Sequence, residues 1–504
     1  MQITLSCARD AVDRLACRGA AASEGLTLGE PQLVPDDRPT AGPGTSGILL
    51  IHPVTCWVSQ PPPFPDLGLG YLAAVLISQG HHVRLRDWNT DPSPEALEKE
   101  LRAFAPRVVG MKVFTKDVAA ARKTAALVRA ALPDTVMLLG GPHASCADPE
   151  ELLGDFPQVD FALRMEGEES LPRLILELEA CPAWRSDPAW PARAETIPGL
   201  VWRHGDVVRA NPGQVIADLN GLPLPVWDLM DPATYAADLM LPGLKPGPAA
   251  PIITTRGCPG QCSFCSAFLV SGRRIRFRSP SEVVREIRLL HDRFGVSKFL
   301  FFDNCFTSSR RHITGICQGV LDAGLDIVWD CNCYENLNSL DRETVALMAR
   351  AGCRMVHMGI ESASPRVRQR TCMTASLEGY LGTARLLRSN GIGVGAWFIL
   401  GFPGETLSDM WRTLRFALAM APEVGSFTRC FPLPNSQVYQ ELKKSRAFSR
   451  LDWSTYRPDR DSLSTLPPLA LGAALEASRF LLRVRQRLGR RSQAARDRDS
   501  RGRA

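Results

Sequence analysis

The chain has 504 residues, which is too long for one ordinary domain, so we expect two or three domains. Hydrophobic residues make up 45% and charged residues 22%, a composition typical of globular proteins, and no apolar run reaches the roughly 18 residues that a membrane helix needs. The net charge is +6, but the segment after residue 482 alone carries nine arginines and two aspartates. We expect this segment to be a solvated, frayed tail, so the charge does not indicate a nucleic-acid partner.

The N-terminal stretch MQITLSCARDAVDRL lacks the basic start and apolar core of a signal peptide. We therefore expect a cytoplasmic protein with no membrane partner, in which thiols stay reduced. In that setting the 15 cysteines indicate metal binding or catalysis and not a disulfide framework.

The first half of the chain alternates strand and helix patterns after a start, residues 1–45, that is predicted to be disordered. Short apolar or alternating runs predict strands, and periodic apolar patterns predict helices between them. The expected strands are 47–53, 82–87, 107–113, 135–141 and one that begins at 159, and the expected helices are 69–80, 94–104 and 117–132. Such alternation predicts a Rossmann-like domain with a parallel sheet over residues 46–180, with its ligand at the carboxyl ends of the strands.

Residues 181–245 form an expected connector, which is rich in Pro and Trp and contains the hairpin-like sequence VWRHGDVVRANP. A second alternating region follows and predicts a full or partial (β/α) barrel over residues 246–447. Its expected strands are 252–257, 298–303, 327–333, 355–362 and 394–402, and its expected helices are 279–295, with Ser281 as N-cap, 310–324, 341–352, 377–391 and 405–420. Residues 448–504 are expected to form a small helical region and the basic tail.

Three cysteines, Cys258, Cys262 and Cys265, stand in a C-x3-C-x2-C pattern directly after a predicted barrel strand. A structural zinc site usually needs four ligands, and no matching second pair of cysteines is present. A [4Fe–4S] cluster takes one thiolate per iron, so three thiolates leave one iron open for a substrate or cofactor. An iron–sulfur cluster is the favoured interpretation, with zinc or unliganded thiols as the alternatives.

The sequence CPGQCSFC, with Phe264 before the last cysteine, resembles the signature of radical S-adenosylmethionine (SAM) enzymes. FFDNCFT (301–307), MGIES (358–362), ILGFPGET (399–406) and FPLPNSQVY (431–439) resemble motifs of the subfamily that carries an N-terminal cobalamin-binding domain. The resemblance covers about residues 46–445. It implies that the three cysteines hold the cluster, that the open iron binds SAM, and that an electron from a donor such as flavodoxin or ferredoxin generates a 5′-deoxyadenosyl radical.

The resemblance also implies roles for residues at the ends of later strands. Glu361 and Ser362 resemble the pair that contacts the ribose or methionine part of SAM, Asp303 the contact to its amino group, and Gly401 with Gly404 the approach to adenine. Each position has a structural alternative, namely a strand-end ion pair, a loop-opening aspartate or a turn glycine. Glu405 does not match the family's spacing and receives no role. A second cluster from Cys305, Cys331, Cys333 and Cys353 is disfavoured, because buried free cysteine is common.

The first domain lacks G-x-G-x-x-G after its first strand, which disfavours a dinucleotide. Gly140 and Gly141 before PHAS, together with MKVFT (111–115), GLGYLAA (68–74) and EGEES (166–170), resemble cobalamin-binding domains and imply bound cobalamin, as methylcobalamin during the reaction. No histidine has Asp two residues before it, so the D-x-H-x-x-G motif is absent, and His52 and His143 are interpreted as loop residues. We therefore expect no histidine beneath the cobalt, which would favour methyl transfer to a carbon radical.

The resulting prediction is a cobalamin-dependent radical SAM methyltransferase that acts on an unactivated carbon of a small molecule, in specialised metabolism such as antibiotic biosynthesis. The first alternative keeps both cofactors and catalyses oxidative cyclisation or rearrangement. An RNA methylthiotransferase is less favoured, because the upstream cysteines have no matching motif, and a non-enzymatic binding module is a remote alternative.

Overall fold

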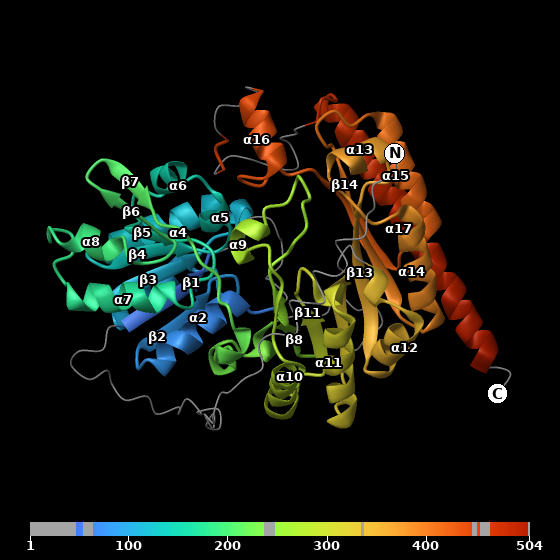
Figure 1. Ribbon diagram of the computed structural model, residues 1–504, viewed down its shortest axis with the longest axis horizontal. Coiled ribbons are helices and arrows are strands. Elements are labelled where there is room, and N and C mark those ends of the chain that lie inside the picture. The colour runs from blue at the N-terminus through green and yellow to red at the C-terminus, as the bar shows by residue number, and fades with distance from the viewer. Residues whose placement is uncertain are drawn as a thin grey trace, which may run out of the picture. The chain divides into compact units, whose positions relative to one another are not determined.

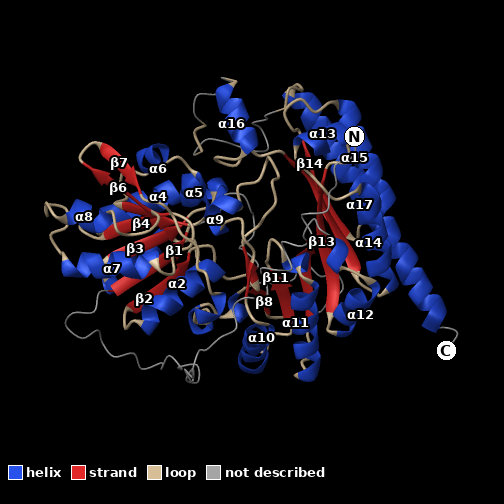
Figure 2. Ribbon diagram, in the orientation of Figure 1, coloured by secondary structure: helices blue, strands red, loops and turns tan. Residues whose placement is uncertain are grey.

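The first sheet has seven strands in the order β2-β1-β3-β4-β5-β6-β7, and its first five strands are parallel (Figures 1 and 2). Their bounds are β1 (Gly47–His52), β2 (His82–Asp87), β3 (Val108–Lys112), β4 (Val136–Gly140) and β5 (Phe161–Leu163). The computed structural model describes residues 47–53, 64–235, 247–333, 337–445, 451–453 and 464–501, all within the compact unit Pro43–Ala504. The segment 1–45, predicted to be disordered, lies outside the described residues. The order 2-1-3-4-5 confirms a doubly wound, Rossmann-like sheet.

Helices cover both faces of this sheet because its strands are apolar on both sides. In β1, Ile48 and Leu50 point to one helical layer, and Leu49 and Ile51 point to the other. The first layer contains α2 (Leu67–Ser78) and α7 (Ser170–Ala180), and the second contains α3 (Pro94–Phe104), α4 (Val118–Ala131) and α6 (Pro149–Asp155). The strand order reverses between β1 and β3, so the carboxyl ends of these two strands border the place where such folds bind ligands.

The sheet continues beyond residue 180, because the predicted hairpin joins it. The hairpin β6 (Leu200–His204) and β7 (Val207–Ala210) turns at Gly205, and β6 pairs antiparallel with β5. The tryptophans of this segment explain why it docks here. The rings of Trp184 and Trp190 lie 4.7 and 5.7 Å from Phe161 of β5, measured between centroids.

The second sheet is a partial barrel of six parallel strands in the order β15-β14-β13-β12-β11-β8. Its strands are β8 (Ala249–Ile252), β11 (Lys298–Phe301), β12 (Val328–Cys333), β13 (Cys353–Glu361), β14 (Gly393–Leu400) and β15 (Val424–Arg429). The helices between them are α10 (Pro280–Phe294), α11 (Arg310–Asp322), α12 (Arg342–Arg350), α14 (Leu377–Ser389) and α15 (Leu407–Met420), and each packs on the outer face. The predicted α/β architecture, a Rossmann-like domain followed by a partial barrel, is therefore confirmed.

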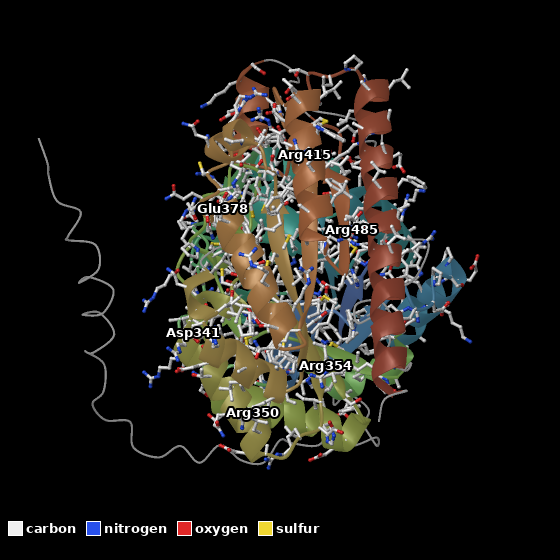
Figure 3. The ribbon with its side chains drawn as sticks, turned by 90° about the vertical axis from the view of Figure 1, so that its right-hand side faces the viewer. Asp341, Arg350, Arg354, Glu378, Arg415 and Arg485 are labelled. Carbon is white, nitrogen blue, oxygen red and sulfur yellow. The ribbon has the colours of Figure 1, made fainter. Side chains whose placement is uncertain are left out.

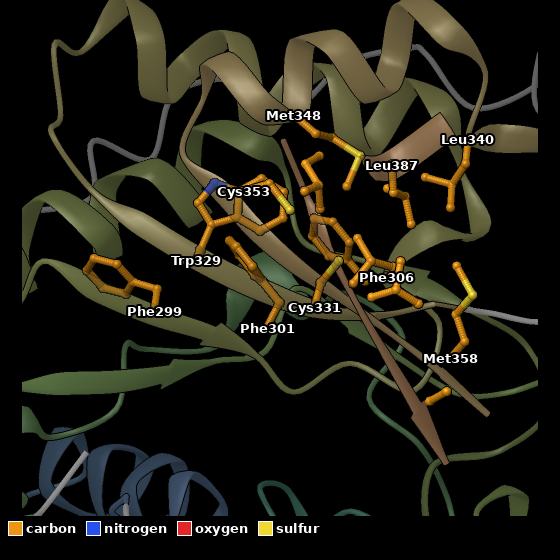
Figure 4. Packing of buried hydrophobic residues seen from close by; sticks show 14 of the residues in the cluster. Phe299, Phe301, Phe306, Trp329, Cys331, Leu340, Met348, Cys353, Met358 and Leu387 are labelled. Atoms are coloured by element: carbon orange, nitrogen blue, oxygen red, sulfur yellow. The ribbon is translucent and has the colours of Figure 1, made fainter. Parts of the chain in front are cut away.

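Aromatic side chains form the centre of the barrel's outer core (Figure 4). The ring of Phe301 lies 5.1 Å from Trp329 in an edge-to-face contact and 4.7 Å from Phe306. Cys331 and Cys353 lie among these rings, in an apolar environment that suits neutral thiols.

Three local expectations need correction. The barrel strand before the cysteines is Ala249–Ile252, and Thr255–Arg256 forms a separate short strand, β9, paired antiparallel with β10 (Arg276–Phe277). The N-cap of α10 is Ser279 and not Ser281, because Pro280 takes the first helical position, where its missing N–H costs nothing. Strand β15 was not predicted, because VGSFTR lacks a sustained apolar pattern.

The C-terminal helix α17 (Pro468–Arg501) replaces most of the predicted frayed tail. Leu471, Leu475 and Leu482 of α17 are buried in the core of the second sheet, and the helix packs against β15 and α15. Figure 3 labels Arg415 on α15 and Arg485 on α17, in this outer helical layer. Among the described residues, no helix is both long and apolar enough to cross a membrane.

Candidate active site

The three motif cysteines lie in a loop between β9 and the short helix α9 (Phe268–Ser271). Gly257 starts the loop with φ +98°, and a Cβ there would lie 2.1 Å from the carbonyl oxygen of Arg274, so only glycine fits. The amide of Cys258 donates to the carbonyl oxygen of Gly272 at 3.0 Å and closes the loop. A Cβ at Gly260 would lie 3.3 Å from Cys258 Sγ and 3.8 Å from Cys262 Sγ, so these two sulfurs flank one glycine.

The exposure of the three thiols also suits ligands. All three are partly exposed, whereas most other cysteines of the described ranges are buried. Burial still raises the pKa of Cys265, although the amide of Ala267, which donates to its Sγ at 3.4 Å, opposes that rise. Within the described ranges, no three His, Cys, Asp or Glu side chains are arranged to hold a single metal ion. The case for a cluster therefore rests on the position of Cys258 Sγ and Cys262 Sγ about one glycine, the loop geometry and the sequence pattern.

The FPLPNSQVY segment supports the cysteine loop from the far end of the barrel. The amide of Val438, in α16 (Gln437–Lys444), donates to the carbonyl oxygen of Ser263 at 2.9 Å. Ser266 Oγ donates to the carbonyl oxygen of Pro434 at 2.8 Å. The ring of Phe264 lies 5.6 Å from that of Phe402, in a small apolar cluster of its own. Phe264 is part of the loop, so this contact anchors the loop against Phe402.

Glu361 lies near the cysteine loop, as the resemblance implied. It ends β13 with φ +60°, unusual for a residue with a side chain, and its Oε1 would lie 2.6 Å from a Cβ at Gly359. Its charge adds to burial in raising the pKa of Cys265. Ser362 is hydrogen-bonded to the helix behind the sheet, and its expected contact to SAM stays a prediction. It is fully buried, and its Oγ is hydrogen-bonded to Thr413 Oγ1 of α15 at 3.2 Å.

Asp303 makes several hydrogen bonds within the protein. Its Oδ1 accepts from the amide of Thr254 and from Thr255 Oγ1 at 2.8 Å each, and its Oδ2 accepts from Thr254 Oγ1 at 3.1 Å. Burial raises the pKa of Asp303 to about 6, and these hydrogen bonds limit the rise. These hydrogen bonds tie the end of β11 to the strand that leads into the cysteines, and the expected contact of Asp303 to the amino group of SAM stays a prediction.

Gly401 lies in a turn beside α17, and its expected approach to adenine stays a prediction. Its φ is +88°, and a Cβ there would lie 3.0 Å from Leu471 of α17. The amides of Gly401 and Phe402 both donate to Glu405 Oε2, at 2.5 and 3.1 Å. Burial raises the pKa of Glu405 to about 7. Sequence reasoning gave Glu405 no role, and its position just before the N-terminus of α15 was the available signal.

The second-cluster alternative gains no support among the described residues. Cys331 and Cys353 belong to the apolar core, and Cys333 Sγ accepts from Thr307 Oγ1 at 3.4 Å. Cys305 lies beside the motif loop instead, since its thiol is hydrogen-bonded to Cys258. This hydrogen bond and burial together raise the pKa of Cys305.

A cavity of about 660 Å³ lies between the first sheet and the residues that flank the cysteine loop on either side. One wall is made by the carboxyl ends of β1, β3 and β4, including Gly110, Gly140 and Gly141, and the opposite wall includes Thr255 and Arg256. A Cβ at Gly140 would meet no atom within 4 Å, so open space lies in front of this glycine. The aromatic lining residues are Phe64, Tyr71, Phe114 and Phe302, and the charged ones are Asp66, Lys112, Lys116, Glu166, Glu168 and Arg256.

The glycine wall fits a bulky cofactor. Gly141 has φ +90°, and a Cβ there would lie 2.7 Å from Lys112 Cγ. Lys112 is held by Asp66 at 2.7 Å, and this ion pair lowers the pKa of Asp66 although burial alone would raise it. His52 lines the cavity and lies 3.5 Å from Asp87. His143 is buried outside the lining, and burial lowers its pKa to about 3, so it is neutral. A cobalt without a histidine ligand stays a prediction.

A buried ion network links the acidic EGEES loop to the hairpin that carries the cysteines. Glu166 accepts from both terminal nitrogens of Arg276 at 2.7 Å and from the amide of Ile216 at 2.6 Å. Glu168 pairs with Arg256, two residues before Cys258, at 2.7 Å. The two glutamates and Arg256 also line the cavity, so the network sets the distance between its two walls.

Comparison with known proteins agrees with this architecture. The family model of the B12 binding domain matches residues 59–175, and that of the Radical SAM superfamily matches residues 252–417. The chain therefore combines a cobalamin-binding domain with a radical SAM domain. It belongs to the cobalamin-binding radical SAM enzymes, and the [4Fe–4S] cluster, SAM and cobalamin predicted from the sequence are the cofactors of that family.

Two curated relatives and one solved structure are similar to this chain. An uncharacterized methyltransferase of Pyrococcus horikoshii is 27% identical over 78% of this chain and 81% of its own length. An anaerobic magnesium-protoporphyrin IX monomethyl ester cyclase of Rubrivivax gelatinosus is 26% identical over 75% of this chain and 66% of its own. The radical SAM methyltransferase TsrM of Kitasatospora setae, solved with cobalamin and a [4Fe–4S] cluster, has a TM-score of 0.63 at 19% identity and covers 80% of this chain and 75% of that chain.

Proposed function

We propose that this chain is a cobalamin-dependent radical SAM methyltransferase. It transfers a methyl group from SAM, through methylcobalamin, to an unactivated carbon of a small molecule in specialised metabolism. One observation carries the proposal. The glycine wall at the ends of β3 and β4 and the residues directly before Cys258 line the same cavity. We therefore place the substrate in this cavity, between the glycine wall and the strand that leads into the cysteine loop.

The chain's own residues would divide the work as follows. Cys258, Cys262 and Cys265 would hold the cluster, and Glu361 lies beside them as the candidate contact to SAM. Gly140, beside Gly141 in the cavity wall, leaves space for cobalamin at the edge of the first sheet. When bound, these groups supply a substrate radical and the methyl group that it receives. The protein's part is to hold both sites at a fixed separation and to keep water from the radical.

Aromatic side chains in the cavity lining are suited to keeping water from the radical. Phe64 and Phe302 make an edge-to-face contact with ring centroids 5.5 Å apart, and both line the cavity. Phe302 is 41% exposed, so it offers an apolar surface to an occupant of the cavity. A small-molecule substrate is favoured by this lining and by the similarity to TsrM, which was also solved with tryptophan as substrate and a SAM analog.

The main alternative keeps the cofactors and omits methyl transfer, and the similarity to the magnesium-protoporphyrin cyclase favours it. Deuterated-methyl SAM separates the two. After anaerobic reconstitution with cobalamin, iron and sulfide, the methyltransferase is expected to yield labelled product, S-adenosylhomocysteine and 5′-deoxyadenosine. An unlabelled, cyclised product with 5′-deoxyadenosine would favour the alternative. Absence of 5′-deoxyadenosine with an intact cluster would refute radical chemistry.

A further inference from the structure

The outer edge of the cysteine loop reaches the protein surface. Pro259 and Gln261 are exposed, and Cys258 and Cys262 on either side of them are partly exposed. A cluster held by this loop would therefore lie just beneath the surface. An electron could enter there without any opening of the substrate cavity.

Two arginines at the end of the loop give this edge a positive charge. Arg273 Nη1 donates to the carbonyl oxygen of Gly260 at 3.0 Å, and its guanidinium lies 3.9 Å from the centre of the Phe268 ring. Arg274 follows directly, and its carbonyl oxygen packs against Gly257 at the base of the loop. Both side chains are exposed, and in the part of the chain that the structure describes neither pairs with a carboxylate.

A second pair of arginines borders the loop from α13 (Pro365–Arg370). The amide of Ser263 donates to the carbonyl oxygen of Thr371 at 3.3 Å, which places the end of α13 against the cysteines. Arg366 and Arg370 are both more than half exposed, but Asp409 and Glu441 pair with them and offset their charge. The excess positive charge at the loop therefore comes from Arg273 and Arg274.

We propose that Arg273 and Arg274 form the docking surface for a small acidic one-electron carrier protein of the flavodoxin or ferredoxin type. This inference rests on the proposed function, because that function requires a cluster that accepts electrons. One electron passes from the reduced carrier to the cluster, so the carrier is oxidised by one electron and no covalent bond changes. Redox encounters of this kind use small, transient interfaces, in which opposite charge mainly accelerates association.

Charge reversal at Arg274 gives the sharpest test, because this side chain forms no ion pair among the described residues. Arg274→Glu is compared with Arg415→Glu, the same change on α15 in the outer helical layer (Figure 3). Each reconstituted protein is mixed anaerobically with flavodoxin hydroquinone, and reduction of the cluster is followed by its absorbance at low and high ionic strength. Arg274→Glu is expected to lower the second-order rate constant about tenfold at low salt, with convergence at high salt. Arg415→Glu is expected to behave as the native protein.

Two further measurements separate docking from damage. Photoreduced 5-deazaflavin, a small reductant, is expected to reduce the cluster at the same rate in all three proteins. Slower reduction of the Arg274→Glu cluster by 5-deazaflavin would overturn the docking argument. Binding of oxidised flavodoxin to the unreconstituted proteins, measured by calorimetry, is expected to weaken only for Arg274→Glu. Equal rate constants for reduction by flavodoxin in both variants would also overturn the inference. So would a result in which Arg274→Glu weakens the binding of a single-stranded RNA oligonucleotide but not that of flavodoxin. Failure of the native protein to hold a reducible cluster would instead refute the proposed function.

Discussion

The ion pair between Glu166 and Arg276 makes a quantitative prediction about the link between the two cofactor sites. Glu166→Gln removes the negative charge and leaves the Arg276 guanidinium, 7% exposed, without its carboxylate. Removal of one partner from a buried pair costs about 3–5 kcal/mol, because the remaining charge stays desolvated and uncompensated. For a cooperative unit of about 200 residues, this corresponds to a drop in melting temperature of roughly 10 °C.

The assay is thermal unfolding of the cofactor-free protein, followed by circular dichroism. The matched control is Glu98→Gln, which breaks an i,i+4 pair on α3 whose side chains are 44% and 69% exposed. The control is expected to change stability by no more than about 0.5 kcal/mol. The double variant Glu166→Gln with Arg276→Met is expected to recover part of the loss, since it removes the orphaned charge. If Glu166→Gln and Glu98→Gln lower the melting temperature equally, the network does not hold the two walls together.

Three other predictions test individual residues of the site. Gly141→Ala is expected to lower the amount of cobalamin retained after reconstitution, since φ is +90° and the new methyl group would clash, whereas Gly154→Ala, with open space around it, is expected to retain it fully. Burial raises the pKa of Glu405 from 4.5 to about 7, so the folded protein binds more protons than the unfolded chain between these pH values and its free energy of unfolding falls by roughly 3 kcal/mol as pH rises through them. Urea unfolding at pH 5 and pH 8 is expected to show a smaller fall for Glu405→Gln, and an identical fall would contradict the burial argument. Ser362→Ala is expected to leave SAM affinity unchanged in equilibrium dialysis while Glu361→Gln weakens it, and weaker binding by both variants would instead support the expectation that both residues contact SAM.

Local sequence patterns predicted most of the fold because they report burial directly. The run GILLIH is buried on both faces, and such a run has few stable positions other than a central parallel strand. The strand at 252–257 was misplaced for a related reason. Thr254 and Thr255 continue the β-branched pattern of the barrel strand, but their amides and hydroxyls are bound by Asp303 and not by a neighbouring barrel strand. That partner lies 48 or 49 residues away and no local pattern reports it.

In the site, too, features set by local sequence were predictable, and features set by distant packing were not. The cysteine triplet is a local pattern, and the structure places it in one loop, as expected. Positions at strand ends were also predictable, but the direction of a side chain there depends on packing. Ser362 turns toward α15 and Gly401 toward α17, because those helices cover the outer face of the sheet. Glu405 was missed because its role appears only when the turn after β14 brings two amides to one carboxylate oxygen.

The hairpin β9–β10 explains why an acidic loop in the first domain matters for the cysteines. The hairpin has only two residue pairs, Arg256 with Arg276 and Thr255 with Phe277, so its own backbone hydrogen bonds cannot fix its position. Both members of the first pair are arginines, and like charges directly opposite each other destabilise a strand pair. Glu166 and Glu168 remove that repulsion, and they come from the other wall of the cavity. Contacts from the barrel and these two glutamates of the cobalamin-binding domain together set the position of the cysteine loop, and the two cofactor sites are expected to be coupled in stability as well as in chemistry.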